Sequence, residues 1–267
     1  MQGTPIVDSI VSSSVSIGAG AARHLELAVR HIMRGQGAVE SGSSLRLITG
    51  EQHPFGNMVI LSDAGNPEAM EVAVAPLLDL EVPAMVLCTE GVSDQVARML
   101  VEQGFKQGAM PAMAVDIERL RSTALQSGYE WTRIAAGKDG SEWSDVLAAG
   151  YGLPPGLARM FSPEVLGADT APDARTQFFG IRHDGRLVAT SMLFLANGLA
   201  GIYCVATLRE ERGKGLGAHV TAEALRTAHG LGYRVGVLQS SDEGHGVYLG
   251  LGFADLGWVP MFIRMPA

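Results

Sequence analysis

The sequence contains little cysteine and no grouping of metal ligands. Only two of its 267 residues are cysteines, Cys88 and Cys204, and both lie inside apolar stretches. Cysteines in that setting are typical of small core residues in a reducing compartment, so no disulfide is expected. The histidines and cysteines form neither an H-x-x-H nor a C-x-x-C pattern, and no metal site is predicted.

The chain also lacks an excess of positive charge and a long apolar run. A formal net charge of −8 argues against general binding of nucleic acid or of an anionic membrane surface. No segment reaches about 18 uninterrupted apolar residues, the length of a membrane-spanning helix. Residues 1–8 have no basic region of the kind that begins a signal peptide. We therefore expect a cytoplasmic protein with no nucleic-acid or membrane partner.

What the sequence does contain is a hydrophobic fraction of 47% with 18% charged residues, a balance typical of a globular protein with a sizeable core. Its length suits one large domain or two smaller ones. Helical and alternating apolar patterns predict both kinds of element. The predicted helices are 21–33, 67–80, 94–103, 142–149, 157–166 and 216–230, and the predicted strands are 45–49, 58–61, 84–88, 130–135, 177–182, 187–195, 199–205 and 233–239.

A basic, glycine-rich segment from Thr207 to Ala218 separates the strand at 199–205 from the helix that follows it. Glycines let the backbone turn sharply and approach a ligand, so that several N–H groups can point at one phosphate. The helix N-terminus adds partial positive charge there. Arg212 and Lys214 supply full charges, and Arg212 can hold a phosphate with two hydrogen bonds. The segment therefore predicts an anion site, while Arg209, Glu210 and Glu211 are expected to form an exposed charged turn beside it.

Three kinds of phosphate site have patterns that can be compared with this segment. The P-loop pattern G-x-x-x-x-G-K-[ST] is absent. The dinucleotide pattern G-x-G-x-x-A matches Gly213, Gly215 and Ala218 and would indicate an NAD-type oxidoreductase, but that fold begins with a βαβ unit rather than the antiparallel hairpins expected here. The third pattern, R-x-x-G-x-G, matches Arg212, Gly215 and Gly217. A solvated charge run at a helix start is the alternative without a ligand.

The R-x-x-G-x-G pattern behind a strand ending in Val205 resembles the acetyl-CoA pyrophosphate loop of the GNAT N-acetyltransferase superfamily. Downstream, Tyr248, Gly252 and Phe253 match the Y-x-x-x-G-F pattern that GNAT enzymes carry. The resemblance covers residues 176–267 well and extends more weakly back to Tyr129. It implies an α+β fold, with a central, mostly antiparallel sheet flanked by helices, and an N-acetyltransferase that uses acetyl-CoA as co-substrate.

The same resemblance implies roles for particular residues. Backbone N–H groups of the glycine-rich turn would hold the pyrophosphate, the main chain of two strand residues would pair with the pantetheine arm, and an N–H near Val205 would meet the thioester oxygen. The implied cofactor-binding residues are Val205, Thr207, Arg212, Gly213, Lys214, Gly215, Leu216, Gly217 and Ala218.

Tyr248 is implied as the general acid that protonates the departing CoA thiolate. A phenol with a pKa near 10 stays protonated at neutral pH and can give its proton to a thiolate. The alternative for Tyr248 is a half-buried core residue of a helix. Asp242, Glu243 and His245 precede it, and the sequence does not distinguish which of them, if any, is the general base. The acceptor would be a small-molecule or peptide amine, and a homodimer is possible.

The two halves of the chain resemble one another. A shift of 148 residues places Gly104-Phe105 on Gly252-Phe253, in each case between a helix end and an apolar strand. This predicts a degenerate GNAT-like domain at 1–120 and a catalytic GNAT domain at 126–267, joined by a helical connector over 117–127. A non-catalytic acyl-CoA-binding protein is the alternative function for such a chain.

The first half lacks the features of a cofactor site. The 148-residue shift places Leu100 opposite Tyr248, so the phenol is missing. In place of R-x-x-G-x-G the first half has Asp63, whose charge would repel a pyrophosphate, and Pro67, which removes an N–H donor. Only the second half is therefore predicted to bind acetyl-CoA.

Overall fold

The computed structural model of the chain describes residues 14–167, 171 and 173–266. The expectation about a signal peptide concerns residues 1–8, which lie outside that range. Among the helices described, none has the length and apolar character needed to cross a bilayer. The strands form one eleven-stranded sheet in the order β1-β2-β3-β4-β11-β5-β10-β9-β8-β7-β6.

The helices and strands follow the predicted order closely. The strands are β1 (Val39–Ser41), β2 (Ser44–Ile48), β3 (Asn57–Leu61), β4 (Ala84–Cys88), β5 (Lys106–Asp116), β6 (Tyr129–Ile134), β7 (Thr176–His183), β8 (Arg186–Ala196), β9 (Leu199–Thr207), β10 (Val235–Gln239) and β11 (Ala254–Arg264). The α-helices are α2 (Ser14–Met33), α3 (Pro67–Leu78), α4 (Asp94–Glu102), α5 (Lys138–Tyr151), α6 (Pro155–Arg159), α7 (Pro163–Leu166), α8 (Leu216–Gly230) and α9 (Asp242–Leu251). Short 3₁₀ turns are η1 (Pro54–Gly56), η2 (Ile117–Arg119) and η3 (Arg209–Glu211).

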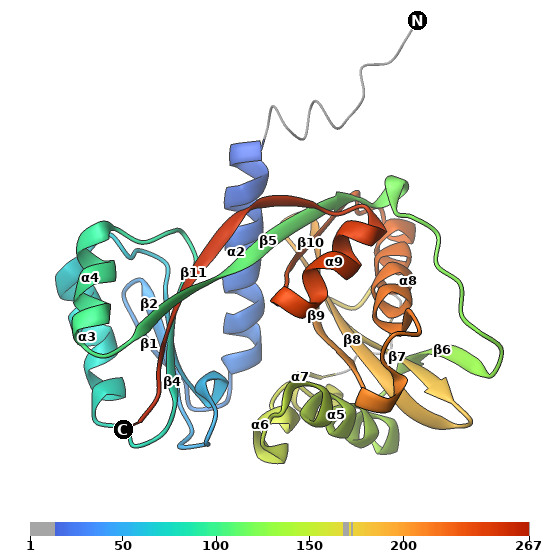
Figure 1. Ribbon diagram of the computed structural model, residues 1–267, viewed down its shortest axis with the longest axis horizontal. Coiled ribbons are helices and arrows are strands. Elements are labelled where there is room, and N and C mark those ends of the chain that lie inside the picture. The colour runs from blue at the N-terminus through green and yellow to red at the C-terminus, as the bar shows by residue number, and fades with distance from the viewer. Residues whose placement is uncertain (1–13, 168–170, 172, 267) are drawn as a thin grey trace, which may run out of the picture.

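The predicted helical connector at 117–127 is wrong for most of its length. Only η2 is helical, and residues 120–126 have no regular structure. The connector runs from the middle of the sheet to the edge strand β6 (Figure 1). An extended chain covers about 3.3 Å per residue and a helix only about 1.5 Å, so the short connector must be extended to make this crossing.

The internal repeat appears in the structure as a repeat of elements. α4 and α9, each followed by a glycine with positive φ, lead into β5 and β11, two strands of equal length that lie 148 residues apart. α3 and α8 precede them in corresponding places. The duplication inferred from two matched dipeptides therefore extends over whole elements of both halves.

The two halves exchange their last strands. β5, from the first half, lies between β10 and β11, while β11, from the second half, lies between β4 and β5. Figure 1 shows β5 and β11 running side by side across the middle of the molecule. The sheet is therefore continuous through both halves, and the division into domains at 1–120 and 126–267 stays a prediction.

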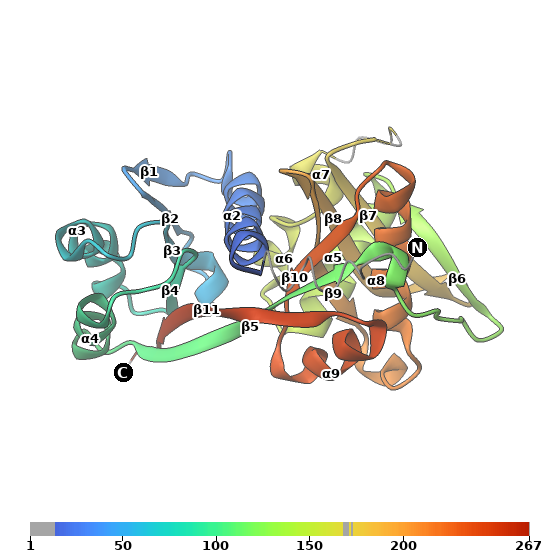
Figure 2. The same cartoon turned by 90° about the horizontal axis from the view of Figure 1, so that it is seen from above.

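Helix α2 covers the centre of this shared sheet on one side, where it contacts β11, β9, β5, β10 and β8. In Figure 2 it lies on the opposite side of β5 and β11 from α9. Further along the sheet, α5 and α8 cover opposite faces of β9, because Ala206 faces Gly150 of α5 and Val205 faces Gly217 of α8.

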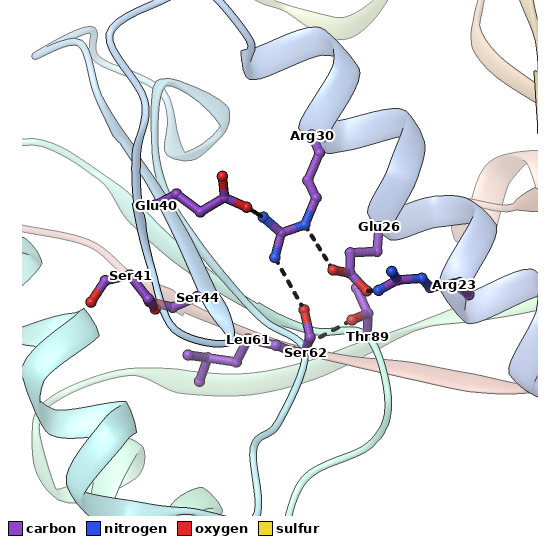
Figure 3. A network of polar contacts seen from close by, with 9 residues as sticks. All are labelled: Arg23, Glu26, Arg30, Glu40, Ser41, Ser44, Leu61, Ser62 and Thr89. Atoms are coloured by element: carbon purple, nitrogen blue, oxygen red, sulfur yellow. Dashed lines mark hydrogen bonds and ion pairs between the residues drawn. The ribbon is translucent and has the colours of Figure 1, made fainter.

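A buried carboxylate on α2 lies at the centre of the ion pairs that join this helix to strands of the first half (Figure 3). Glu26 is 1% exposed, and its oxygens lie 2.7 Å from Arg23 Nη1 and 2.7 Å from Arg30 Nε. Arg30 also pairs with Glu40 and donates to Ser62 Oγ at the end of β3. Burial alone would raise the pKa of Glu26, but hydrogen bonds from Ser62, Arg30 and Arg23 outweigh it and lower the pKa. Two guanidinium groups thus compensate the buried charge, and Arg30 joins α2 to the end of β3 and to β1.

Candidate active site

Strand β9 contains a bulge. Cys204 has φ of 54°, and the register with β8 shifts between Thr190 and Met192. The Thr190 hydroxyl donates to the Cys204 carbonyl at 2.9 Å and fixes this conformation. A positive φ is uncommon outside glycine, and bulges that redirect a strand are frequent beside active sites. The bulge therefore turns the main chain at Cys204 and Val205 out of the regular ladder.

Next to the bulge, the parallel strands β9 and β10 separate. Their pairing covers Leu199–Gly201 opposite Val235–Val237 and stops there, although β9 continues to Thr207 and β10 to Gln239. From that point the facing N–H and C=O groups of the two strands no longer bond to each other. Main-chain groups of this kind require a partner, so the opening is a place where an extended ligand can pair with the backbone.

Polar side-chain atoms at this end of β10 also lack partners among the residues that the structure describes. Both carboxamide atoms of Gln239 and the hydroxyl oxygen of Ser240 are buried without a hydrogen bond. The Ser240 N–H, in contrast, donates to the Pro111 carbonyl of β5 at 3.0 Å. Unsatisfied buried groups are costly and rare. Their position is consistent with a polar ligand or water in the opening.

The glycine-rich turn lies against the end of β9. Gly213 and Gly215 have φ of 79° and 77°, and Gly215 caps α8 with no side chain. The N–H groups of the first turn of α8 therefore have no side-chain cap and can donate hydrogen bonds to an anion. A Cβ on Gly217 would lie 3.8 Å from both Val205 Cγ1 and Thr207 Oγ1. The structure thus brings the predicted turn and the predicted strand residues together, and their roles in binding stay a prediction.

The expected exposed turn at 209–211 is wrong for Glu211, which is 9% exposed. Its carboxylate lies 2.6 Å from Lys214 Nζ, accepts a 2.7 Å hydrogen bond from the Tyr129 hydroxyl, and lies 3.1 Å from His183 Nδ1. Hydrogen bonds from Lys214 and then Tyr129 lower the pKa of Glu211 to about 2. The charge of Lys214 is thereby paired within the protein, and the turn is attached to β6 and β7.

Replacing Glu211 by Gln is expected to remove a pH-dependent part of the stability. The folded-state pKa of about 2 lies below the ordinary 4.5, so the carboxylate stabilises the fold above pH 4.5 and loses this effect as the pH falls. Urea unfolding should show Glu211→Gln less stable than the wild type near pH 6, with the difference shrinking toward about pH 3. Glu210→Gln, at an exposed neighbour, is the control. A difference that does not change with pH would contradict the assignment.

Arg212 is also held by the protein, though less completely. Its Nε donates to the Thr207 carbonyl at 3.4 Å and its Nη2 to the Gly150 carbonyl at 3.3 Å. Nη1 lies 3.9 Å from a carboxylate oxygen of Glu243, and the side chain is 48% exposed. The guanidinium therefore joins the end of β9 to the end of α5 and keeps an accessible edge beside the glycine-rich turn.

Tyr248 lies in the last turn of α9 and is 9% exposed. Its ring packs edge-on against Phe253 with the centroids 5.8 Å apart, and burial raises the pKa of the phenol to about 12. The phenol therefore stays protonated at neutral pH, as a general acid must. In the first half, Leu100 is buried at the corresponding place near Phe105. The position is thus buried in both halves, and only the second half carries a hydroxyl there. The catalytic role of Tyr248 stays a prediction.

A second phenol, which the sequence analysis missed, reaches the bulge from α5. Tyr151 is the last residue of α5, and a Cβ on Gly150 just before it would lie 2.7 Å from the Ala206 Cβ of β9. Burial, followed by Cys204 and Tyr248, raises the pKa of Tyr151 well above its ordinary value. No local pattern could have linked Tyr151 to residues more than fifty positions away.

Two of the candidate bases have partners of their own. Glu243 faces Arg212, and His245 Nε2 lies 2.8 Å from Asp255 Oδ1. Asp242 is in the exposed first turn of α9. The general base therefore stays open among these residues and water.

The corresponding place in the first half is closed. β3 and β4 pair along their whole length, and the Thr89 N–H extends the pairing to the Leu61 carbonyl. The Asn66 side chain caps α3 by accepting from the Ala69 N–H, and Asp63 accepts from the Gly65 N–H. The strands do not separate, and a side chain already occupies the N-terminus of the helix.

Residues 153–253 match the profile of the acetyltransferase (GNAT) family. None of the curated protein sequences compared with the chain matches it. Among solved structures, the GCN5-related N-acetyltransferase from Kribbella flavida is similar with a TM-score of 0.64 and 22% identity, over 92% of this chain and 96% of that chain. The GCN5-related N-acetyltransferase from Sphaerobacter thermophilus has a TM-score of 0.61 and 14% identity, over 88% and 84%. A tandem GNAT protein from the clavulanic acid biosynthesis pathway has a TM-score of 0.53 and 16% identity, over 86% and 82%.

These matches confirm the predicted resemblance and the mixed α/β fold with a mostly antiparallel sheet. The family profile covers the glycine-rich turn and Tyr248. The structural similarity extends through both halves, and one similar protein is itself a tandem GNAT protein, which is consistent with the duplication. With identities at or below 22%, the structural similarity establishes the fold and not the substrate.

Proposed function

We propose that this chain, an acyltransferase with a GNAT domain at residues 153–253, transfers the acetyl group of acetyl-CoA to a primary amine. The observation that carries the proposal is the opening between β9 and β10 beside a helix N-terminus without a side-chain cap. An anionic head with a long, amide-containing arm fits this arrangement. Its pyrophosphate would accept hydrogen bonds from the N–H groups of the turn. The amides of its arm would pair with main-chain groups where β9 and β10 no longer pair with each other.

In this binding mode, the N–H groups of residues 213–218 and the accessible edge of Arg212 hold the pyrophosphate. The helix dipole of α8 adds to that attraction. The main chain of Val205 and Thr207 pairs with the amides of the pantetheine arm. Because Lys214 is paired with Glu211, Arg212 is the main full charge that this turn offers to the phosphates.

The reaction follows from the groups around the bulge. The amine nitrogen attacks the thioester carbon, a C–N bond forms, and negative charge develops on the former carbonyl oxygen. The Val205 N–H stabilises that oxygen. The C–S bond then breaks, Tyr248 gives its proton to the CoA sulfur, and the amine loses a proton to a base or water. The products are an amide and free CoA.

A charge reversal at Arg212 tests the binding mode. We expect Arg212→Glu to weaken acetyl-CoA binding strongly, because a carboxylate would repel the pyrophosphate and the neighbouring Lys214 is already paired with Glu211. Arg209→Glu makes the same charge change at an exposed neighbour and should have a much smaller effect. Calorimetry should give one acetyl-CoA per wild-type chain, since the first-half site is closed.

Other outcomes would contradict this account. Equal affinity of the two variants for acetyl-CoA would remove Arg212 from the site, and two equivalents per chain would contradict the closed first half. Tighter binding of NAD than of CoA would favour the dinucleotide alternative. Thermal melts of both variants show whether a loss of affinity reflects a loss of fold.

A further inference from the structure

The last residue of β10, Gln239, faces the side of the sheet that α2 covers. A Cβ on Gly236 would lie 2.8 Å from Leu225 Cδ2 of α8, so Gly236 faces the α8 side. The next residue, Val237, packs in one cluster with Ala21 of α2. Because side chains alternate along a strand, Gln239, two residues further on, faces the α2 side as well.

Gln239 also lies level with Tyr203, across the opening between β9 and β10. These strands pair with Gly201 opposite Val237, and two residues further along each strand are Tyr203 and Gln239. Tyr203 faces the α2 side too, because its hydroxyl oxygen lies 2.9 Å from Nδ1 of His24, a residue of α2. On this side, the opening is therefore bordered by a phenol ring that α2 holds in place and by the carboxamide of Gln239.

The Gln239 carboxamide has no hydrogen-bonding partner within the part of the chain that the structure describes. Both Oε1 and Nε2 are buried and unpaired. Ala112, which lies opposite Gln239 on β5, packs in an apolar cluster with Leu25 of α2. Gln239 as a whole is half-buried, so rotation about its side-chain bonds brings the carboxamide into the opening. Buried polar groups without partners are costly and rare, and one beside an opening in the sheet points to a ligand that pairs with it.

In the proposed reaction, the ligand on this side is the acceptor and not the cofactor. The glycine-rich turn lies on the α8 side of β9, where a Cβ on Gly217 would lie 3.8 Å from Val205 Cγ1. Acetyl-CoA reaches the opening from that side, which leaves the α2 side to the amine. The three residues before Tyr203 are buried, whereas Tyr203 and Cys204 are half-buried. β9 thus becomes accessible where the opening begins.

We propose that Gln239 recognises the acceptor, and that the acceptor is an amine carrying an amide group, as an amino-acid amide or a peptide N-terminus does. The inference rests on the proposed function and adds a substrate class to it. A carboxamide has an acceptor oxygen and a donor NH₂ group. An amide offers the complementary pair and satisfies both, whereas an ammonium group only donates and a carboxylate only accepts. A site built to form such bonds also rejects analogues that lack the bonding group.

The test compares glycinamide, which carries the amide, with propylamine, which is similar in size and lacks it. Gln239→Met keeps the length of the side chain and removes both polar atoms. With acetyl-CoA and thiol detection, this variant should lose roughly 5- to 100-fold in kcat/KM for glycinamide, the equivalent of two net hydrogen bonds, mainly through KM. The loss for propylamine should be much smaller, and the acetyl-CoA affinity should stay at the wild-type value. Each amine is compared with itself in the two proteins, so the difference in amine basicity cancels.

Gln107→Met makes the same change at an exposed position of β5 and is the matched control, with no expected effect on either reaction. Thermal melts give a second readout. Replacing an unpaired buried carboxamide by an apolar side chain should keep or raise the melting temperature of Gln239→Met. The wild type tests the substrate class without any variant, because its KM for glycinamide, counted as unprotonated amine, should lie below that for propylamine.

Several results would overturn the inference. Equal losses for the two amines, or a lowered melting temperature with both reactions impaired, would make Gln239 a structural residue. Weaker acetyl-CoA binding by Gln239→Met would place the carboxamide on the pantetheine arm instead. A wild type that acetylates propylamine but not glycinamide would exclude the substrate class. If the wild type acetylates no amine, the proposed function fails and this inference fails with it. If it acetylates amines and Gln239→Met behaves as the wild type does, only this inference fails.

Discussion

Residues 126–267 expressed alone are expected not to form a stable folded domain, although they contain the whole GNAT family match. In the full chain, β5 lies between β10 and β11, and β4 covers the other edge of β11. Without the first half, β10 loses β5 along Val235–Gln239 and keeps only its short pairing with β9, and β11 loses both of its neighbours. Phe262 of β11, fully buried among core residues of the first half, would become exposed.

Unpaired strand edges and exposed apolar side chains favour aggregation. Burial of a large apolar side chain such as Phe262 contributes about 1.5–3 kcal/mol, which is a large share of the stability of a small domain. Far-UV circular dichroism and size exclusion should therefore show an unfolded or aggregated fragment without a cooperative melt.

The matched control is the same cut with both pieces present. Coexpression of residues 1–125 and 126–267 places the break in the connector, which has no regular structure there, and should restore a folded complex that binds acetyl-CoA. A monomeric fragment 126–267 that melts cooperatively and binds acetyl-CoA would contradict the strand exchange as a requirement for folding.

Tyr248→Phe is expected to keep the fold and the acetyl-CoA affinity while losing turnover. The change removes one hydroxyl and keeps the ring contact with Phe253. If the phenol supplies the proton to the departing thiolate, kcat should fall by roughly 10²- to 10⁴-fold, the usual effect of a positioned acid. The measurement is steady-state kinetics beside a thermal melt and a calorimetric titration.

A structural role for Tyr248 would give a different result. The loss of one hydrogen-bonding group changes the free energy of unfolding by about a kcal/mol, so a lowered melting temperature with unchanged kcat would mean that another group is the acid. Tyr151 lies near enough to Tyr248 to be the next candidate, and the double variant would separate their contributions.

The features that the sequence predicted well are local ones. The glycine-rich turn, the adjoining strand β9 and helix α8 are encoded by neighbouring residues, since glycine permits the positive φ of Gly213 and Gly215 and apolar spacing marks the helix. The two-residue turns at Asp184-Gly185 and Asn197-Gly198 have positive φ at each position, as the predicted hairpins require.

Features that depend on distant residues were not predictable in the same way. The 148-residue shift related β5 to β11, but no local sequence pattern indicates that each strand pairs inside the other half. Glu211 was expected at the surface because its charged neighbours are nearby in sequence, whereas Tyr129 and His183, which bury it, come from two other strands. The end of α5 likewise meets β9 only because Gly150 allows the helix to approach Ala206.

The most direct test of the central claim is an assay of free CoA thiol with acetyl-CoA and a panel of primary amines, followed by mass analysis of the amine. We predict that at least one amine gains a single acetyl group in an amount equal to the thiol released, and that Tyr248→Phe abolishes most of this release. Tight binding of acetyl-CoA with no thiol released above the uncatalysed rate for any amine would contradict the enzyme and leave an acyl-CoA-binding protein.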